Sequence, residues 1–112
     1  MKKIEAIVRP EKLDILIDRL ENAGVTGLNV INVKGYGSQK GHTEVYRGVT
    51  YNIKLREKIR IETVIPDDLA SQVVDTITET AKTGEVGDGK IFVSNVENAV
   101  RIRTGETGQE AL

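Results

Sequence analysis

Two glycine-rich segments that each carry a lysine give the strongest chemical signal in this chain. The first runs from Gly35 to Gly41 (GYGSQKG) and the second from Thr83 to Lys90 (TGEVGDGK). Glycines allow several backbone N–H groups to converge on one point, and a nearby ammonium group adds positive charge. Two further cations, Arg101 and Arg103, follow near the C-terminus. This combination favours binding of an anion such as a phosphate and predicts a nucleotide-binding protein; the alternative is a pair of flexible turns.

Neither segment fits a standard nucleotide fingerprint. Gly84 to Lys90 has the spacing of a P-loop, but Ile91 stands where Ser or Thr would hold magnesium. The segment also leads into a predicted strand, whereas a P-loop leads into a helix. The Gly35–Gly41 segment is one residue too long for the dinucleotide motif, and no predicted helix follows it.

Composition limits the class of protein. The chain has 112 residues, which indicates one domain spanning 1–112, and its formal net charge is −1. A nucleic-acid-binding protein would usually carry a basic surplus. The chain has no cysteine and one histidine, His42, which excludes disulfides and the usual His/Cys metal sites. No apolar run approaches the roughly 20 residues of a membrane span, so we expect a soluble, cytoplasmic protein without direct membrane insertion.

The order strand, proline, acidic helix start and apolar helix occurs twice, from residue 4 and again from residue 61. One face of each helix is apolar, and a second strand follows each helix, at about 28–34 and 90–95. The pattern predicts an α+β fold: a ferredoxin-like double βαβ with a four-stranded antiparallel sheet. A short final strand from Val100 to Arg103 is expected to add to an edge. The apolar helix positions are Leu13, Leu16, Ile17 and Leu20, then Leu69, Val73, Ile77 and Thr80 or Ala81.

Two helices cover only one face of such a sheet. Ile4, Ala6 and Val8 would face the helices. The other face would mix charged and apolar side chains and needs another layer. We expect self-association with closed symmetry rather than a monomer with this face in water. Its expected members are Glu5, Ile7, Glu62 and Val64, with Phe92 and Val96, or Ile31 and Val33, adding apolar area.

The connection between strands two and three is long, about 36–55, and polar. Long loops in compact domains are usually functional or disordered. This one holds Tyr46 and Tyr51, which would be partner anchors or modification targets. Local packing of both rings on the loop's own residues is the alternative.

Taken together, these features resemble the PII signal-transduction proteins of nitrogen regulation, over essentially the whole chain. The most specific stretches are QKGHTE from Gln39, YRG from Tyr46, KTG from Lys82, GDGKIFV from Gly87 and IRTGE from Ile102.

The resemblance implies a homotrimer with nucleotide sites in the three clefts between subunits. Adenine would lie near Ile7 and Val64, and Lys90 would bind phosphate. Arg101 and Arg103 would reach in from the neighbouring subunit, side by side on one strand. The remaining implied nucleotide contacts are Gly35, Tyr36, Gly37, Ser38, Gln39, Gly87, Asp88 and Gly89.

The family senses ATP against ADP, and 2-oxoglutarate together with ATP and Mg²⁺. By resemblance, Gln39 is the magnesium ligand, and Lys58 pairs with the far carboxylate of 2-oxoglutarate. Backbone amides from about Gly37 to Gly41, including those of Gln39 and Lys40, would hold the rest of this ligand. From the residues alone, the alternative is that Lys58 is a solvated lysine at the start of a strand.

The long loop, about 36–55, matches the family's T-loop, which docks on target proteins. Arg47 resembles the residue that plugs the pore of an ammonium channel in channel-associated members, and a solvated loop-tip arginine is the alternative. Such docking would recruit the protein to the inner face of the membrane.

Three departures from the family pattern matter. Ser38 replaces an arginine that reaches the phosphates in many members, which should weaken nucleotide binding or alter ATP/ADP discrimination. The residues before Tyr51 differ from those of uridylylated members, which puts that modification in doubt. Val49 removes a serine that cyanobacterial members phosphorylate, and the segment 52–55 also differs.

We therefore expect a non-enzymatic sensor that controls an ammonium channel or nitrogen-assimilation enzymes. The alternatives are an adenylate-only sensor, a small ATP-hydrolysing protein on the same fold, and a structural trimer whose glycines are only turns. Catalysis is disfavoured because the chain shows no Ser/His/Asp set and no paired catalytic carboxylates. His42 lies on the long loop and is a weak candidate for a base.

Overall fold

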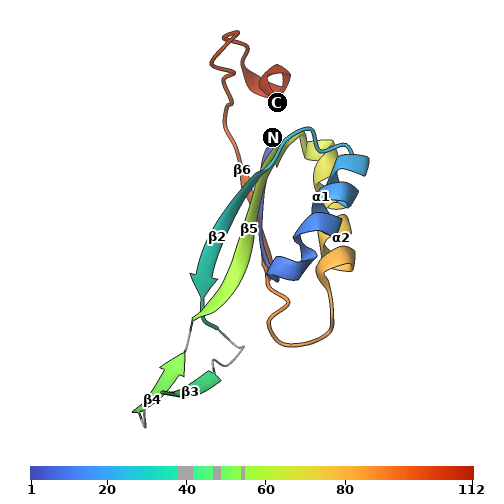
Figure 1. Cartoon of the computed structure of the whole chain (residues 1–112). Helices are drawn as coiled ribbons and strands as arrows, with labels where there is room; N and C mark the ends of the chain where they lie inside the picture. The colour runs from blue at the N-terminus through green and yellow to red at the C-terminus, as the bar shows by residue number, and fades with distance from the viewer. Residues whose placement is uncertain (38–41, 47–48, 54) are drawn as a thin grey trace.

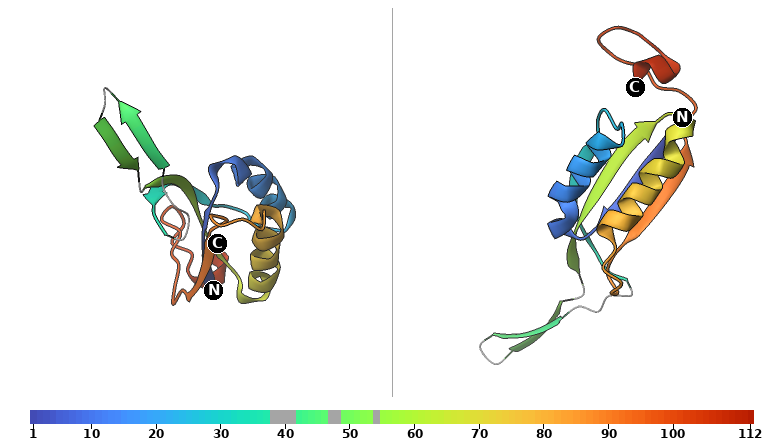
Figure 2. Two further views of the ribbon diagram at one scale, coloured as in Figure 1. Left: turned by 90° about the horizontal axis from the view of Figure 1, so that it is seen from below. Right: turned by 90° about the vertical axis from the view of Figure 1, so that its right-hand side faces the viewer.

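A computed structural model describes residues 1–37, 42–46, 49–53 and 55–112. Within these residues, an antiparallel sheet is formed by β1 (Lys2–Val8), β2 (Asn29–Gly35), β5 (Arg56–Ile65) and β6 (Lys90–Asn95). The strand order is β2-β5-β1-β6. Figure 1 shows this sheet nearly edge-on, with β2, β5 and β6 labelled. The helices α1 (Leu13–Asn22) and α2 (Ala70–Ala81) both lie on one face of this sheet (Figure 2). This is the predicted ferredoxin-like double βαβ fold.

Each βαβ half begins its helix in the same way. A short 3₁₀ turn, η1 (Pro10–Lys12) or η2 (Asp67–Leu69), precedes α1 or α2. Pro10 starts η1, while Pro66 lies one residue before η2. Proline has no N–H to leave unpaired in a first turn, and acidic residues there complement the helix dipole. Both features appear in the sequence repeat, so local chemistry sets both helix starts.

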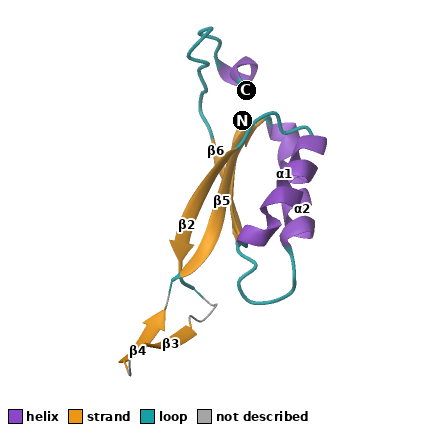
Figure 3. Cartoon of the chain, in the orientation of Figure 1, coloured by secondary structure: helices purple, strands orange, loops and turns teal. Residues whose placement is uncertain are grey.

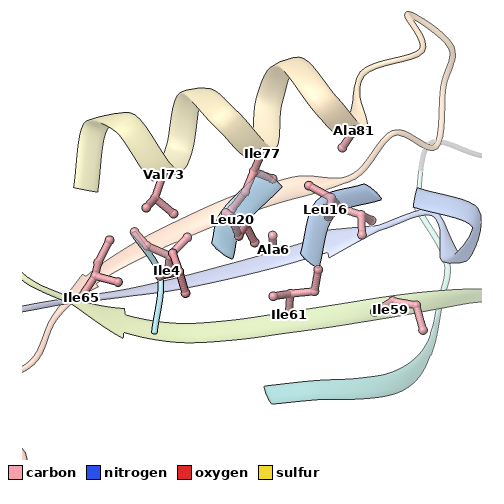
Figure 4. Packing of buried hydrophobic residues seen from close by; sticks show 12 residues of the cluster. Ile4, Ala6, Leu16, Leu20, Ile59, Ile61, Ile65, Val73, Ile77 and Ala81 are labelled. Carbon is pink, nitrogen blue, oxygen red and sulfur yellow. The ribbon is translucent and has the colours of Figure 1, made fainter. Parts of the chain in front are cut away.

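The core lies between the helices and the sheet (Figure 4). Leu16 and Leu20 from α1 are fully buried, as predicted from their spacing. Val73 and Ile77 from α2 are also buried, as predicted. Burying each such side chain contributes roughly 1.5–3 kcal/mol. α1 ends before Gly24, which adopts a φ of 99°. The sheet contributes Ile4, Ala6, Val8, Ile59, Ile61 and Ile65 to this core.

The opposite face of the sheet carries the mixture of side chains that the sequence predicts. Directly opposed residues share a face, so the pairs of Ile7 with Arg60 and Lys90 place all three there. Arg60 Nε lies 3.0 Å from Glu62 Oε1, and Lys3 Nζ lies 3.8 Å from the same carboxylate oxygen. The apolar members of this face are Ile7, Ile31, Val33, Val64 and Phe92.

The long connection contains a hairpin that the sequence did not predict. β3 (His42–Tyr46) pairs antiparallel with β4 (Val49–Ile53), and this pair forms a sheet of its own. Figure 3 shows the hairpin projecting from the end of the main sheet where β2 ends and β5 begins. The strand β5 starts at Arg56, so the connection closes close to the predicted boundary.

The predicted strand from Val100 to Arg103 is wrong. Val100 makes one isolated bridge with Thr107, and residues 102–104 form a turn. The chain folds back because Gly105 and Gly108 adopt φ values of 74° and 66°, which favour glycine. A short 3₁₀ helix, η3 (Gly108–Ala111), follows. Arg101 and Arg103 therefore do not alternate along a strand.

Candidate anion-binding site

A cavity of about 340 Å³ opens on the uncovered face of the sheet, near the end from which the hairpin projects. It brings both glycine-rich segments together, although about forty residues of chain separate them. Among the described residues, those that line the cavity include no acidic side chain. They are Ile7, Gly35, Tyr36, Gly37, Arg56, Lys58, Gly87, Gly89, Lys90 and Phe92.

A larger hollow of about 460 Å³ lies elsewhere, between the end of α1 and the start of β2. Glu21 is the one charged residue among the described residues that line it. It contains no residue of either glycine-rich segment. Size alone therefore does not identify the binding site, and the chemistry of the lining favours the smaller cavity.

Asp88 organises the 83–89 loop at the edge of the smaller cavity. Its carboxylate accepts hydrogen bonds from the backbone N–H groups of Thr83 (2.8 Å) and Gly84 (2.9 Å), and from the Thr83 hydroxyl. The hydroxyl bond is the main reason that the pKa of Asp88 lies well below its ordinary value, and the backbone bonds add to it. The sequence placed Asp88 among the nucleotide contacts. The structure engages its carboxylate within the loop itself.

Arg9 holds this loop from outside. Its Nε donates to Asp88 Oδ1 (3.2 Å) and its Nη2 donates to the Val86 carbonyl oxygen (2.9 Å). Two donors on one rigid guanidinium group fix both the position and the orientation of the loop. Sequence analysis did not single out Arg9. Its place directly after β1 and before Pro10 was the available signal.

Gly89 brings the loop backbone against β1. Its φ is 102°, and a Cβ atom built on it would lie 1.7 Å from the carbonyl oxygen of Ile7. Real Cβ atoms never approach that closely, so glycine alone fits here. Lys90 follows directly and pairs with Ile7 across the sheet. The predicted association of glycine backbone with a lysine is present in this geometry.

Lys58 connects β5 to the same loop. Its ammonium group donates a hydrogen bond to the Gly87 carbonyl oxygen at 2.6 Å. Partial burial is the main cause that lowers the pKa of Lys58, and the nearby Arg9 adds to it, while Glu11 acts in the opposite direction. Lys58 is thus part of the cavity wall rather than a solvated lysine.

Three predicted residues lie away from this cavity in the same chain. Val64 pairs with Lys3, four residues from Ile7 along β1, which is about 13 Å at the usual rise of a strand. Arg101 donates to Glu106 Oε1 (3.0 Å) and to the Leu112 carbonyl oxygen (3.1 Å). Arg103 lies in the exposed turn of the C-terminal segment. Figure 1 shows that segment at the end of the sheet opposite the hairpin.

The remaining predicted site residues cannot be placed. Ser38, Gln39, Lys40, Gly41 and Arg47 lie outside the described residues. Tyr51 is in β4, opposite Glu44, and only its backbone is described. Their assigned roles stay predictions.

Arg56 and Phe92 line the cavity but were not predicted to do so. Arg56, Lys58 and Arg60 alternate along β5 and so lie on one face of the sheet. That period-two spacing of cations was visible in the sequence. Phe92 was expected on the open face, but its position beside the glycine-rich segments depends on the strand register.

The fold and the cationic, glycine-lined cavity define a small α+β protein with a candidate anion-binding site. Residues 1–106 match the family model described as Nitrogen regulatory protein P-II. The chain therefore belongs to the nitrogen regulatory protein P-II family, and its role is in signal transduction.

Curated relatives agree with this family over their full length. The chain is 53% identical over 112 residues to the nitrogen regulatory protein P-II of Rhodobacter capsulatus and 50% identical to that of Haemophilus influenzae. It is also 53% identical to nitrogen regulatory protein P-II 1 of Escherichia coli K12. Each match covers all of both chains. All three relatives are named as regulatory proteins.

No helix among the described residues is long and apolar enough to cross a membrane.

Proposed function

We propose that this protein senses nitrogen and energy status by binding ATP or ADP, and 2-oxoglutarate with Mg²⁺, in the cavity on the open face. The observation that carries this proposal is that both glycine-rich segments line one cavity together with Lys58 and Lys90. Among the described residues that line this cavity, none is acidic. Such a site attracts polyanions and disfavours cations. The family assignment supports the same conclusion.

The cavity suits a nucleotide in both size and polarity. Its volume of about 340 Å³ falls within the range of small-molecule sites. Ile7 and Phe92 offer an apolar wall for a base. Gly87 and Gly89 allow close approach of backbone to phosphates, and Lys90 supplies charge next to them.

A homotrimer would complete this site. Val64, Arg101 and Arg103 lie too far from the cavity of their own chain, so a second copy must bring them to it if they bind nucleotide. The uncovered face, with Phe92 half-exposed, supplies a surface that association would bury. In this arrangement Arg101 would exchange its contact with Glu106 for contacts with phosphate.

Magnesium and 2-oxoglutarate would bind beside the nucleotide phosphates. The described lining offers no carboxylate to a cation, so Gln39 and oxygens of the ligands themselves would hold Mg²⁺. When bound, the metal would neutralise part of the negative charge of the phosphates and the keto acid. Lys58 would release the Gly87 carbonyl and pair with the far carboxylate, while amides of Gly37, Lys40 and Gly41 hold the near end.

The segment 36–55 would transmit the bound state to a target protein. It starts at cavity residues Tyr36 and Gly37 and ends next to Arg56, so a ligand in the cavity would contact both of its ends. Order–disorder switching by phosphate and metal is an established device in other proteins. The targets would be an ammonium channel, docked through Arg47 at the membrane, or nitrogen-assimilation enzymes. Uridylylation of Tyr51 is not part of this proposal.

Titration calorimetry with phosphate-release measurements tests the proposal. ATP and ADP should bind to the purified protein, and Lys90→Ala should lower both affinities by about tenfold because a charge-assisted contact is lost. Phosphate release under saturating MgATP should stay at the uncatalysed level. Sustained phosphate release would favour the ATP-hydrolysing alternative. Absence of nucleotide binding would overturn the proposed sensing function.

A further inference from the structure

Arg56 is a cavity residue to which no role has yet been given. It is the first residue of β5 and lies directly opposite Gly35, the last residue of β2. Two positions along the same face lies Lys58. Arg56 is partly buried and lines the cavity together with the Gly35–Gly37 backbone. Its positive charge also contributes to the lowered pKa of Lys58, as expected for two cations that lie near each other on one face of the sheet.

The strand register gives the cavity two different ends. Ile7 and Phe92, on β1 and β6, form its apolar end, with Lys90 beside them. Lys90 on β6, Ile7 on β1 and Arg60 on β5 lie side by side across three neighbouring strands. Arg56 lies four residues before Arg60 along β5, so it is two strands away from Lys90 and four residues further along. Ordinary strand spacings make the Cα separation of Lys90 and Arg56 about 16 Å. Both side chains are long, so they can contact an extended polyanion that lies between them.

This polarity orients a nucleotide in the cavity. A base at the apolar end places its first phosphates near Lys90, Gly87 and Gly89. Successive phosphates then extend toward β5, and the last one comes closest to Arg56. A planar guanidinium binds two phosphate oxygens at once, which an ammonium group cannot do with the same geometry.

We infer that Arg56 binds the terminal phosphate of a nucleoside triphosphate and thereby discriminates triphosphates from diphosphates. This inference rests on the proposed nucleotide-binding function and adds to it the residue that distinguishes a nucleoside triphosphate from a diphosphate.

Lys34 provides a matched control. It is on β2, next to Gly35, but points to the other face of the sheet, where its Nζ lies 3.6 Å from Glu57 Oε1. Its removal changes the charge of the same region by one unit without touching the cavity lining. Any general electrostatic effect should therefore appear in Lys34→Ala as well as in Arg56→Ala.

The test is a set of ATP and ADP titrations of the full-length protein and its variants. Arg56→Ala should lose about tenfold or more in ATP affinity but less than about threefold in ADP affinity, since one charged contact to the last phosphate is removed. Arg56→Lys should fall between wild type and Arg56→Ala. Lys34→Ala should bind both nucleotides as wild type does. The ratio of the two affinities does not depend on the fraction of folded protein, so modest destabilisation leaves the result valid.

Two results would overturn the inference in distinguishable ways. If wild type binds both nucleotides and Arg56→Ala keeps the same ATP/ADP affinity ratio, Arg56 does not distinguish ATP from ADP. The proposed function stands in that case. If wild type binds neither nucleotide, the proposed function fails and this inference fails with it. Arg56→Gln, which keeps the side-chain stem as far as Cδ and removes the charge, takes the place of Arg56→Ala should the latter not fold.

Discussion

Lys58 on β5 donates a hydrogen bond to the carbonyl oxygen of Gly87, 29 positions further along the chain, at 2.6 Å. The bond joins the strand that follows the hairpin to the loop that precedes β6. The ammonium group that is proposed to bind 2-oxoglutarate is therefore hydrogen-bonded to the loop that is proposed to bind phosphate. In the proposed function, the keto acid would compete with the Gly87 carbonyl for this ammonium group or share it, and either way one side chain would couple the two parts of the site.

The Lys58 contact gives the first prediction. Lys58→Met keeps most of the side-chain volume but removes the charge. It should lower 2-oxoglutarate affinity by about tenfold or more, since a charged hydrogen bond is lost, while MgATP binding changes little. Backbone amides at 84–88 should exchange hydrogen faster. Calorimetry and hydrogen exchange check both effects, with Lys34→Met as the control. Unchanged 2-oxoglutarate affinity would remove Lys58 from the site.

Gly89 gives a prediction about stability. Gly89→Ala forces a Cβ into the Ile7 carbonyl and a side chain into a left-handed backbone conformation. We expect a loss of about 2 kcal/mol or more in the free energy of unfolding, with nucleotide binding lost as the loop moves. Gly27→Ala is the control, because a Cβ there meets nothing within 4 Å. Urea denaturation of both variants measures the difference, and equal stability would refute the close approach.

Asp88 gives a prediction about pH. Its pKa is lowered in the folded state, so below an unfolded pKa of about 3.9 the unfolded chain binds more protons than the folded one. The carboxylate therefore stabilises the fold fully above that pH and loses this effect as the pH falls through the lowered pKa. The stability gap between wild type and Asp88→Asn should narrow from pH 7 to pH 3 in urea denaturation. A gap that stays constant with pH would show that the charge of Asp88 is not what holds the loop.

Mixed trimers test whether each site is shared by two chains. Lys90 lies in the cavity, while Arg101 would come from a neighbour. In the proposed homotrimer, the Lys90→Ala protein and the Arg101→Ala protein should each bind ATP weakly. After denaturation and refolding together, about one site in four should contain both native residues in a closed trimer. Recovery of a tight-binding fraction in calorimetry is the expected result. No recovery would place Arg101 outside the shared site.

Much of the fold was predictable because local chemistry determines it. The spacing of Leu16 and Leu20 defined α1, and the boundaries of β6 match the predicted strand at 90–95. The C-terminal segment was mispredicted since an alternating apolar–basic run resembles a strand. There, Gly105 and Gly108 reverse the chain, and no sheet edge pairs with Val100. The β3–β4 hairpin was not predicted, because the polar composition of that segment was taken to indicate a loop.

The site was predictable in part for a similar reason. Glycine-rich segments are visible in any sequence, so Gly87, Gly89 and Lys90 were found. Arg56 and Arg9 were not, because the role of a strand cation depends on what its register and the neighbouring loop place beside it. Asp88 was predicted to contact phosphate through its backbone, which stays a prediction. The role of its carboxylate in capping the amides of Thr83 and Gly84 was not foreseen, because it depends on the fold of the loop.

The most direct test of the account is calorimetric titration of 2-oxoglutarate into the protein with and without saturating MgATP. Coupled sensing through one cavity predicts that 2-oxoglutarate binds when MgATP is present and shows no measurable heat of binding when it is absent or replaced by MgADP. Equal 2-oxoglutarate binding in all three conditions, or none in any of them, would contradict the coupling of the nucleotide and keto-acid sites.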